Sequence, residues 1–425
     1  MNTTNSVNVT IVGLGKIGVP LAVQFASKGA TVTGYDISAA RVDEINAKRN
    51  PLPSEPGLDE MLPGLVVSGR LRATTDARDA VAGADVVVLI VPVDVDATQQ
   101  ADFTLLDAAV AAIGPHLRRG VLVIVETTVP VGTTRLRVGP KILEASGMVP
   151  TADFSLAFSP ERVSSGCVLR DLRTYPKIVG GIDTHSAAMA VEFYRAMLDA
   201  EIMPVRDVET AEFSKLAETT YRDVNIALAN EFARLADGLG VDVLQAIDAA
   251  NSQPYSHIHA PGVGVGGHCI PVYPYFLAND QTEIIAAARR LNDDMAHYAV
   301  GRLANALGSL EGATVVVLGL AYRPGVKESR HSSAFGLASA LIAGGATVYV
   351  HDPLYTASEI RGHGLDPPPS FPLAVDALVV QAWHEQYAAL DFKAFPGLRA
   401  ILDGRAALDP AAVEALGIVY VGIGR

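Results

Sequence analysis

Residues 7–18 read VNVTIVGLGKIG, a short apolar run that passes directly into a turn with glycine at positions 13, 15 and 18. In this spacing Gly13 permits a tight turn, Gly15 lets the backbone approach a pyrophosphate, and Gly18 lets the next helix pack on the strand. A helix is predicted over Val19 to Ser27, and its N-terminus offers free N–H groups to a phosphate. The stretch therefore predicts the first strand, turn and helix of a dinucleotide-binding domain.

The following strand supports that interpretation. It is predicted over Thr31 to Tyr35 and ends at Asp36, whose carboxylate is placed to accept hydrogen bonds from ribose hydroxyls and to repel a 2′-phosphate. We therefore expect NAD in preference to NADP. A glycine turn in another kind of α/β protein is the alternative, which strand, helix and acid together disfavour.

Two more apolar runs continue the alternation of strand and helix. Asp85 to Val91 (DVVVLIV) and Val121 to Glu126 (VLVIVE) are typical of buried parallel strands. They end at Pro92 and at Thr127-Thr128, on the edge where ligands of a doubly wound sheet bind. A threonine at such a place can also cap the next helix, and that alternative stays open for one of the two.

Composition limits the classes of protein. The chain has 425 residues, 49% of them apolar, a formal charge of −13 and two cysteines. This length predicts two or three domains, and the negative charge argues against a nucleic-acid partner. The absence of a long apolar run, and of a signal-like N-terminus, predicts a cytoplasmic protein with no membrane partner. No metal-ligand spacing is present, so we expect no metal.

A long helix is predicted over Glu209 to Leu239, with faces that are mostly apolar or alanine-rich. Such a helix needs neighbouring domains or a second subunit to cover it, so we expect a homodimer. Lys215, Thr219, Arg222 and Asn225 recur at three- and four-residue steps and share one face. They can converge on a polar ligand, or form a solvated edge of the helix.

The second unusual stretch is residues 261–276, PGVGVGGHCIPVYPYF, which places Cys269 after four glycines. Glycines in such a run indicate a close approach of backbone or ligand, or positive φ angles. Pro271 and Pro274 keep Cys269 out of a regular helix, on a loop where neighbouring donors can activate a thiol. An inert, buried cysteine is the alternative.

Two further segments complete the chain. A strand over Phe154 to Phe158 leads into SPERV, where Glu161 can orient a water molecule or cap a turn. A second Rossmann-like unit starts at Ala313 to Leu318 and lacks the full glycine fingerprint, so we expect it to hold a nucleotide other than the dinucleotide. Its further strands are predicted at Thr347 to Val350, Ala377 to Val380, Ala400 to Leu402 and Ile418 to Val421.

The motifs GLGKIG, ETTVPVGTT, SPERV, KLAETTYRDVNIALANE and GVGVGGHCIPVYPYF, in this order, resemble the nucleotide-sugar 6-dehydrogenases. GGHC together with RDVNIALANE is closest to the UDP-N-acetylmannosamine dehydrogenase branch. The resemblance implies two Rossmann-like doubly wound domains joined by a long central helix. It divides the chain into an NAD-binding domain (1–205), a central dimerisation and catalytic-loop region (206–310) and a UDP-sugar-binding domain (311–425).

The resemblance also implies a reaction, the four-electron oxidation of a C6 alcohol to a uronic acid for polysaccharide biosynthesis with two NAD. Lys215 matches the lysine beside the developing alkoxide, and Cys269 matches the nucleophile that forms a thiohemiacetal and then a thioester. Glu161 matches the carboxylate that activates water for hydrolysis, and Thr128 matches a threonine that helps to bind water.

The resemblance further assigns binding residues. Those expected to bind NAD are Gly13, Gly15, Lys16, Ile17, Gly18, Asp36, Arg41, Pro92 and Thr128. Those expected to bind the UDP-sugar are Glu161, Arg162, Lys215, Thr219, Arg222, Asn225, Gly266, His268, Tyr273, Arg323 and Arg330.

Two positions depart from the family pattern, because Thr219 and Tyr273 stand where asparagine and aspartate are common. These departures bear on the thioester hydrolysis step and favour a protein that has lost the chemistry. Three alternatives stand beside the favoured N-acetylhexosamine substrate. They are UDP-glucose as substrate, a nucleotide-sugar-binding protein that has lost the chemistry, and a related β-hydroxyacid dehydrogenase. The cysteine loop disfavours the last, because that chemistry needs a lysine and no cysteine.

Overall fold

The computed structural model describes residues 6–53, 55–164 and 166–425. The N-terminal segment on which the expectation about secretion rests begins with residues 1–5, which lie outside the described residues. The chain forms two compact units. The N unit is Met1–Glu218 with Tyr275–Leu277, and the C unit is Thr219–Pro274 with Ala278–Arg425. The three-part division of the chain stays a prediction.

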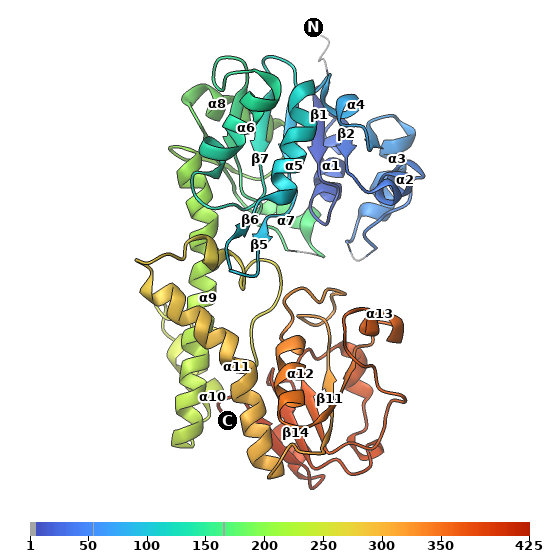
Figure 1. Ribbon diagram of the computed structural model, residues 1–425, viewed down its shortest axis with the longest axis vertical. Helices are drawn as coiled ribbons and strands as arrows, with labels where there is room; N and C mark the ends of the chain where they lie inside the picture. The colour runs from blue at the N-terminus through green and yellow to red at the C-terminus, as the bar shows by residue number, and fades with distance from the viewer. Residues whose placement is uncertain (1–5, 54, 165) are drawn as a thin grey trace. The chain divides into compact units, whose positions relative to one another are not determined.

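The N unit is built on an eight-stranded sheet in the order β10-β9-β8-β7-β4-β1-β2-β3 (Figure 1). Its strands are β1 (Asn8–Val12), β2 (Thr31–Tyr35), β3 (Leu71–Thr74), β4 (Val86–Leu89), β7 (Leu122–Val125), β8 (Ser155–Phe158), β9 (Lys177–Gly181) and β10 (Ile202–Pro204). The six neighbouring strands β3-β2-β1-β4-β7-β8 are all parallel. Counted in chain order, they have the 3-2-1-4-5-6 arrangement of a dinucleotide-binding sheet. β9 runs antiparallel to β8.

Helices cover both faces of this sheet. They are α1 (Gly18–Ser27), α2 (Ala39–Asn46), α3 (Leu58–Val67), α4 (Ala77–Val81), α5 (Thr104–Ile113), α6 (Gly139–Ser146), α7 (Val168–Thr174) and α8 (Thr184–Met197). Alternate residues of each strand enter one of two apolar cores. In β7, Leu122 and Ile124 pack with α1, α3 and α8, whereas Val123 and Val125 pack with α4, α5 and α6. A small hairpin, β5 (Asp94–Val95) and β6 (Ala101–Asp102), comes after β4.

The C unit has a smaller, entirely parallel sheet in the order β12-β11-β13-β14-β15. Its strands are β11 (Thr314–Leu318), β12 (Thr347–His351), β13 (Ala377–Val380), β14 (Ala400–Asp403) and β15 (Val419–Gly422). This is the 2-1-3-4-5 order, the other common doubly wound arrangement. Its helices are α10 (Val243–Asn251), α11 (Glu283–Leu307), α12 (Ser333–Ala343), α13 (Ala357–Gly362) and α14 (Pro410–Glu414). The long helix α9 (Val208–Leu239) contributes residues to both units.

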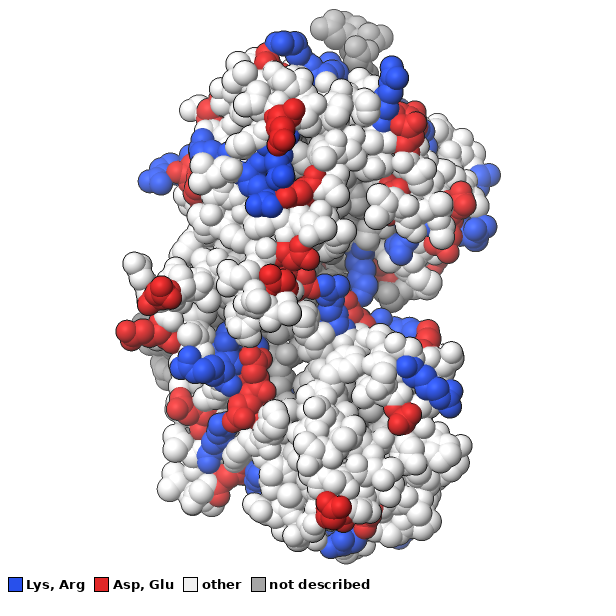
Figure 2. Space-filling model, in the orientation of Figure 1, with Lys and Arg blue, Asp and Glu red and all other residues white. Residues whose placement is uncertain are grey.

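The predicted fold class, two Rossmann-like doubly wound domains with a long central helix, is confirmed. The predicted strands all form, with ends that differ by at most two residues from those expected. The sequence reasoning missed β3, β9, β10 and the β5–β6 hairpin. Within the described part of the chain, no helix is both long and apolar enough to cross a membrane. On the face shown in Figure 2, acidic and basic side chains are interspersed.

Candidate active site

The glycine turn after β1 has three distinct steric environments. Gly13 has a φ of +101°, and a Cβ there would lie 2.9 Å from the Ile90 carbonyl oxygen, beside the end of β4. A Cβ on Gly18 would lie only 1.8 Å from the Gly13 oxygen, so this glycine is required for α1 to pack on the turn. No described atom lies within 4 Å of a Cβ built on Gly15. The open position is the one where a pyrophosphate must approach the backbone.

Asp36 is held beside this turn at the end of β2. Its Oδ2 accepts from the Leu14 backbone N–H at 2.7 Å, and its Oδ1 accepts from the Ser38 N–H at 2.8 Å. A carboxylate has about four acceptor positions, so capacity for ribose hydroxyls remains. Arg41 donates to the Leu14 carbonyl oxygen at 3.1 Å. These residues fit NAD.

The other residues expected to bind NAD lie on neighbouring loops of the same unit. Lys16 is exposed and Ile17 half-buried immediately before α1, and Pro92 is exposed after β4. Thr128, after β7, is 6% exposed. The Thr127 hydroxyl donates to the Val91 carbonyl oxygen at 2.6 Å, so it joins two strand ends and does not cap a helix.

The start of the helical segment that follows β7 is capped by a residue from elsewhere in the chain. The next helical segment, Thr134–Val138, receives its cap from Glu212 of α9. The Glu212 carboxylate accepts from the backbone N–H groups of Gly132 at 2.5 Å and Thr134 at 2.8 Å. The alternative that one of the two threonines caps the next helix therefore does not hold for Thr127.

Glu161 belongs to a buried network of charges. Its Oε1 accepts from the Arg162 N–H at 2.7 Å, and its Oε2 lies 2.9 Å from Lys177 Nζ. Lys177 also contacts Glu126 Oε2 at 3.1 Å, and the Tyr194 hydroxyl donates to Glu126 Oε1. The sequence reasoning missed Glu126, Lys177 and Tyr194, although a glutamate that directly follows an apolar strand was a visible signal.

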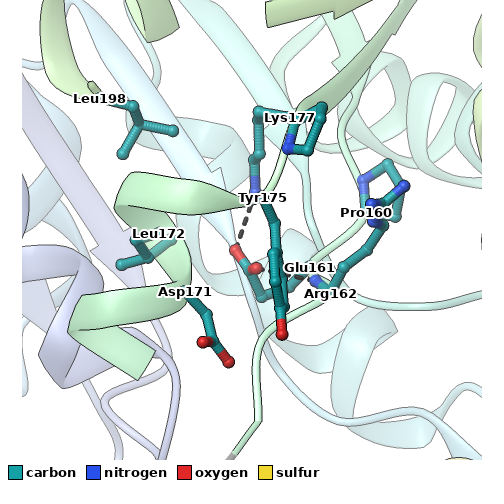
Figure 3. Close-up of a pocket in the computed structure, with 9 residues that line it drawn as sticks. Pro160, Glu161, Arg162, Asp171, Leu172, Tyr175, Lys177 and Leu198 are labelled. Atoms are coloured by element: carbon teal, nitrogen blue, oxygen red, sulfur yellow. Dashed lines mark hydrogen bonds and ion pairs between the residues drawn. The ribbon is translucent and has the colours of Figure 1, made fainter. Parts of the chain in front are cut away.

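A small pocket lies against this network (Figure 3). It is lined by Pro160, Glu161, Arg162, Asp171, Leu172, Tyr175, Pro176, Lys177 and Leu198. In Figure 3 the Lys177 side chain points to the Glu161 carboxylate. Arg162 also contacts Glu218, with Nε 3.5 Å from Oε2.

The four polar residues predicted to share one face of α9 divide into buried and exposed ones. Lys215 is 8% exposed and Thr219 is 3% exposed, so the alternative of a solvated helix edge does not describe them. Arg222 is exposed. The Asn225 side chain donates to the His257 carbonyl oxygen at 2.7 Å and accepts from the His259 N–H at 2.9 Å. Asn225 therefore also anchors the segment that leads into the cysteine loop.

The four glycines before Cys269 are explained by packing within the C unit. Gly264 and Gly267 have φ angles of +135° and +99°. A Cβ on Gly262 would lie 3.0 Å from the Gly404 oxygen, and one on Gly266 would lie 2.9 Å from the His331 oxygen. The predicted close approach is confirmed, and its partner here is protein backbone.

Cys269 is half-buried on this loop, outside any regular helix as predicted. Its carbonyl oxygen accepts from the N–H groups of Val272 and Tyr273, and the short helical turn Tyr273–Phe276 comes next. The His268 ring pairs with the Glu328 carboxylate. Cys167 is also a free thiol, in the N unit at the start of α7.

Two arginines of the C unit contact the loop, and a third contacts Tyr322. Gly267 donates its N–H to the Arg330 carbonyl oxygen at 2.9 Å, and Arg323 contacts the Tyr322 hydroxyl at 3.0 Å. Arg405, which the sequence reasoning missed, donates to the Gly264 carbonyl oxygen at 3.1 Å. Burial of its guanidinium lowers the pKa of Arg405 to about 10. Arg405 thus fixes the backbone of the cysteine loop.

A dinucleotide turn with its acid, a second nucleotide-type sheet and a thiol on a glycine-built loop define a dinucleotide-dependent dehydrogenase. The chain belongs to the UDP-glucose/GDP-mannose dehydrogenase family. The models of its NAD binding domain, central domain and UDP binding domain match residues 7–198, 209–294 and 316–410. The protein is therefore an NAD-dependent nucleotide-sugar dehydrogenase, as the sequence motifs predicted.

Relatives with different substrate names match over most of the chain. A UDP-N-acetyl-D-mannosamine dehydrogenase from Pyrococcus horikoshii is 34% identical over 98% of this chain and 99% of its own. The solved structure from that organism has a TM-score of 0.90, with 98% of this chain and 99% of that chain covered. An NDP-N-acetyl-D-galactosaminuronic acid dehydrogenase from Ralstonia nicotianae is 34% identical, covering 90% of this chain and 92% of its own. A UDP-glucose dehydrogenase structure from Pyrobaculum islandicum has a TM-score of 0.87 and 31% identity, covering 100% of this chain and 99% of that chain.

Proposed function

We propose that this enzyme oxidises the C6 alcohol of a UDP-N-acetylhexosamine, UDP-N-acetylmannosamine in particular, to the uronic acid in a four-electron reaction. The observation that carries the proposal is Cys269 on its rigid loop. Two of its glycines have positive φ angles, and the other two lie against backbone atoms. Arg405 also donates to the Gly264 carbonyl oxygen, and these contacts together fix one loop conformation. A dehydrogenase that stops at the aldehyde has no use for a thiol held in this way.

The first oxidation is assigned to Lys215. As the C6 hydroxyl gives up its proton to water, the alkoxide that develops is stabilised by a neighbouring positive charge, and a lysine that is only 8% exposed acts with little screening. When bound, NAD accepts a hydride from C6 in each of the two oxidations. Asp36 and the open face of Gly15 are the groups of this chain that position it.

The second oxidation and the hydrolysis are assigned to Cys269 and Glu161. The Cys269 sulfur adds to the aldehyde carbon to give a thiohemiacetal, which loses the second hydride and becomes a thioester. Glu161 then takes a proton from water while the water oxygen attacks the thioester carbonyl. The carbon–sulfur bond breaks, and the acid and the Cys269 thiol are released. Thr128 is assigned to hold that water.

The remaining predicted contacts belong to substrate recognition. Guanidinium groups suit diphosphate, so Arg323 and Arg330 are assigned to the nucleotide part of the substrate. The other residues assigned to the substrate are Arg162, Thr219, Arg222, Asn225, Gly266, His268 and Tyr273. Tyr273 lies one turn after Cys269, and its N–H bonds the Cys269 carbonyl oxygen at 2.9 Å, which supports a role close to the thiol.

The test is the number of NADH molecules formed per sugar, with the product identified by mass. We expect two NADH and the acid from UDP-N-acetylmannosamine. Cys269→Ser should abolish acid formation while substrate binding is retained, and Cys167→Ser, the matched control, should leave turnover nearly intact. One NADH per sugar with a trappable aldehyde would contradict the four-electron reaction.

UDP-glucose is the second candidate substrate, favoured by the similarity to the Pyrobaculum islandicum structure. A panel with UDP-glucose and the UDP-N-acetylhexosamines separates the two candidates by kcat/KM. Binding of these sugars without any NADH would favour the non-catalytic alternative.

We also propose a homodimer, formed through α9. Tyr221, Leu228 and Leu235 recur at seven-residue steps and are 56%, 42% and 58% exposed in the single chain, and Leu239 continues the stripe at 75%. An apolar stripe of this kind is stabilised by a second helix. Light scattering should give twice the chain mass, and Leu228→Asp with Leu235→Asp should give the monomer. A monomer for the unaltered chain at micromolar concentration would contradict the proposal. A cytoplasmic location and a role in polysaccharide biosynthesis stay predictions.

A further inference from the structure

The buried charges around Glu161 arise from the one antiparallel pair in the described N-unit sheet. Phe158 of β8 pairs with Gly180 of β9, so continuing the register three residues past Phe158 brings position 161 opposite position 177. On the other side of β8, Val125 of β7 pairs with Phe158 in parallel, which sets Glu126 beside the same strand end. Strand register thus brings Glu126, Glu161 and Lys177 together.

Burial makes this cluster electrostatically strong. The side chains of Glu126, Lys177 and Glu161 are 0%, 5% and 11% exposed. Each carboxylate lies close to the same ammonium group, at 3.1 and 2.9 Å. Water therefore screens these charges weakly, and a change at one member alters the energy of the others.

Glu126 and Lys177 differ in how readily they change charge. Burial raises the pKa of Glu126 to about 7; Lys177 opposes this rise and Glu161 adds to it. For Lys177, burial alone would lower the pKa, but Glu126 and Glu161 together raise it above its ordinary value. The lysine accordingly stays charged at neutral pH, whereas Glu126 can gain or lose a proton there.

Other charged groups face the same carboxylate. Arg162 is next to Glu161 in the chain and contacts Glu218, while Asp171 and Tyr175 line the pocket from α7 and the residue after it. Asp171 accepts from the Ser164 N–H at 3.0 Å and from Arg170. Tyr194 of α8 contacts the cluster through Glu126. Among the described residues, Lys177 is thus the cation whose side chain contacts Glu161, and Glu126 is the second acid on that lysine.

We propose that Lys177 and Glu126 are positioning residues for the Glu161 carboxylate: Lys177 holds it ionised and oriented, and Glu126 adjusts that hold through its own charge. The inference rests on the proposed function, in which Glu161 accepts a proton from the water that attacks the Cys269 thioester. Two fixed contacts, Lys177 on Oε2 and the Arg162 N–H on Oε1, leave the remaining acceptor positions of the carboxylate for that water.

The two positioning residues should have different effects on the pH profile of thioester hydrolysis. Lys177→Met removes the positive charge, so the acid limb should move to higher pH by about 1–3 units, the range that a charge at this distance produces. Glu126→Gln keeps this side chain neutral at every pH, so the change in hydrolysis rate near pH 7, where Glu126 gains its charge in the unaltered protein, should disappear while the acid limb stays in place. In both variants the first hydride step should stay within about twofold, because the positioned group does not take part in it.

The experiment separates the two steps in single-turnover reactions across pH 5–9, with NADH absorbance for the hydride steps and quenched acid product for hydrolysis. Lys177→Arg should restore most of the hydrolysis lost in Lys177→Met, because it keeps the charge. Lys28→Met is the matched control, since it removes a lysine paired with Asp199 at 2.5 Å elsewhere in the same unit. Thermal melting of each variant monitors folding.

An acid limb that Lys177→Met leaves in place, or a change in rate near pH 7 that survives Glu126→Gln, would overturn the proposal and leave the proposed function intact if the unaltered enzyme still forms two NADH and the acid. If Lys177→Met does not fold, the loss or survival of the change near pH 7 in Glu126→Gln decides. One NADH per sugar from the unaltered enzyme would overturn the proposed function and this inference with it.

Discussion

The two units of the molecule use the same turn after their first strand, and only one of them keeps it open. Gly13 and Gly319 come directly after β1 and β11 with nearly equal φ angles, +101° and +102°. Each second strand then leads to an aspartate, Asp36 or Asp352, whose carboxylate accepts from the backbone of that turn. The early geometry of the two folds is thus shared.

The residues after the first glycine differ between the two units. In the N unit Gly15 is open, and α1 begins three residues later at Gly18. In the C unit the corresponding residue is Ala321, which is fully buried, and α12 does not begin until Ser333. The phosphate-facing helix end of the first unit has no counterpart this close to the turn in the described residues of the second.

The two aspartates also differ in how much room they leave for a ligand. Asp352 is 2% exposed and accepts from the N–H groups of Leu320, Ala321 and Leu354. His384 also donates to it at 3.0 Å, because the other ring nitrogen of His384 accepts from the Gly325 N–H. Four protein contacts at a carboxylate that is only 2% exposed leave no room for a ribose. A strand, glycine and acid in sequence therefore specify the turn, while open space and unused acceptors specify the ligand.

The largest effect is expected at Gly18. Gly18→Ala puts a methyl group 1.8 Å from the Gly13 oxygen, so the turn must move, at a cost of about 3 kcal/mol or more in the free energy of unfolding. NAD affinity should fall at least about a hundredfold, because a shift of the turn displaces several phosphate contacts together. Gly15→Ala is the matched variant, with no described atom near its methyl group. It should keep the melting temperature while weakening NAD binding in calorimetry. A Gly18→Ala protein with unchanged affinity would show that the packing of α1 does not set the site.

Asp352→Ala is expected to destabilise the C unit by about 3–5 kcal/mol, because it leaves His384 and three backbone N–H groups buried without their acceptor. NAD binding should be unchanged, since the altered residue lies in the other unit. Urea unfolding with NAD titration measures both quantities. A stable variant with weakened NAD binding would contradict the division of roles.

Asp36→Ala should have the opposite pair of effects, a small loss of stability and a clear change in cofactor preference. The residue is half-buried and accepts two backbone hydrogen bonds, so we expect a loss of about 1–2 kcal/mol in stability. The preference for NAD over NADP, measured as a ratio of kcat/KM values, should fall about tenfold, because the charge that repels a 2′-phosphate is gone. Equal turnover of the unaltered enzyme with both cofactors would contradict the assignment.

The sequence was sufficient where the signal is local. Glycine spacing identified the turn after β1, and the run before Cys269 indicated a close approach that the structure explains with Gly404 and His331. It was insufficient where partners come from distant strands. Lys177 reaches Glu161 only because β9 runs antiparallel to β8, and a parallel sheet was the expectation. Arg405 lies more than a hundred residues from the loop that it fixes, with no motif around it.

The smallest expected effect is on the pH dependence of stability, at one buried acid in each unit, Asp352 and Glu126. Burial would raise the pKa of Asp352, but hydrogen bonds from His384 and from backbone N–H groups hold it below its ordinary value of 3.8. Its stabilising contribution is complete above pH 3.8 and is lost only as the pH falls further. Glu126 behaves oppositely, because its pKa in the folded protein is about 7 against an ordinary 4.5. The folded state binds the extra proton between these values, so Glu126 lowers stability as the pH rises from about 4.5 to 7.

Glu126→Gln removes that dependence. The melting temperature of the variant relative to the unaltered protein should therefore rise between pH 5 and pH 8, by about 2–4 °C for each kcal/mol of relieved penalty. Asp352→Asn, its counterpart in the C unit, should lower the melting temperature by the same amount throughout this range, because Asp352 does not titrate there. Thermal melts at constant ionic strength measure both. A Glu126→Gln difference that stays constant from pH 5 to pH 8 would mean that this carboxyl is ionised throughout, and the two buried acids would then be alike.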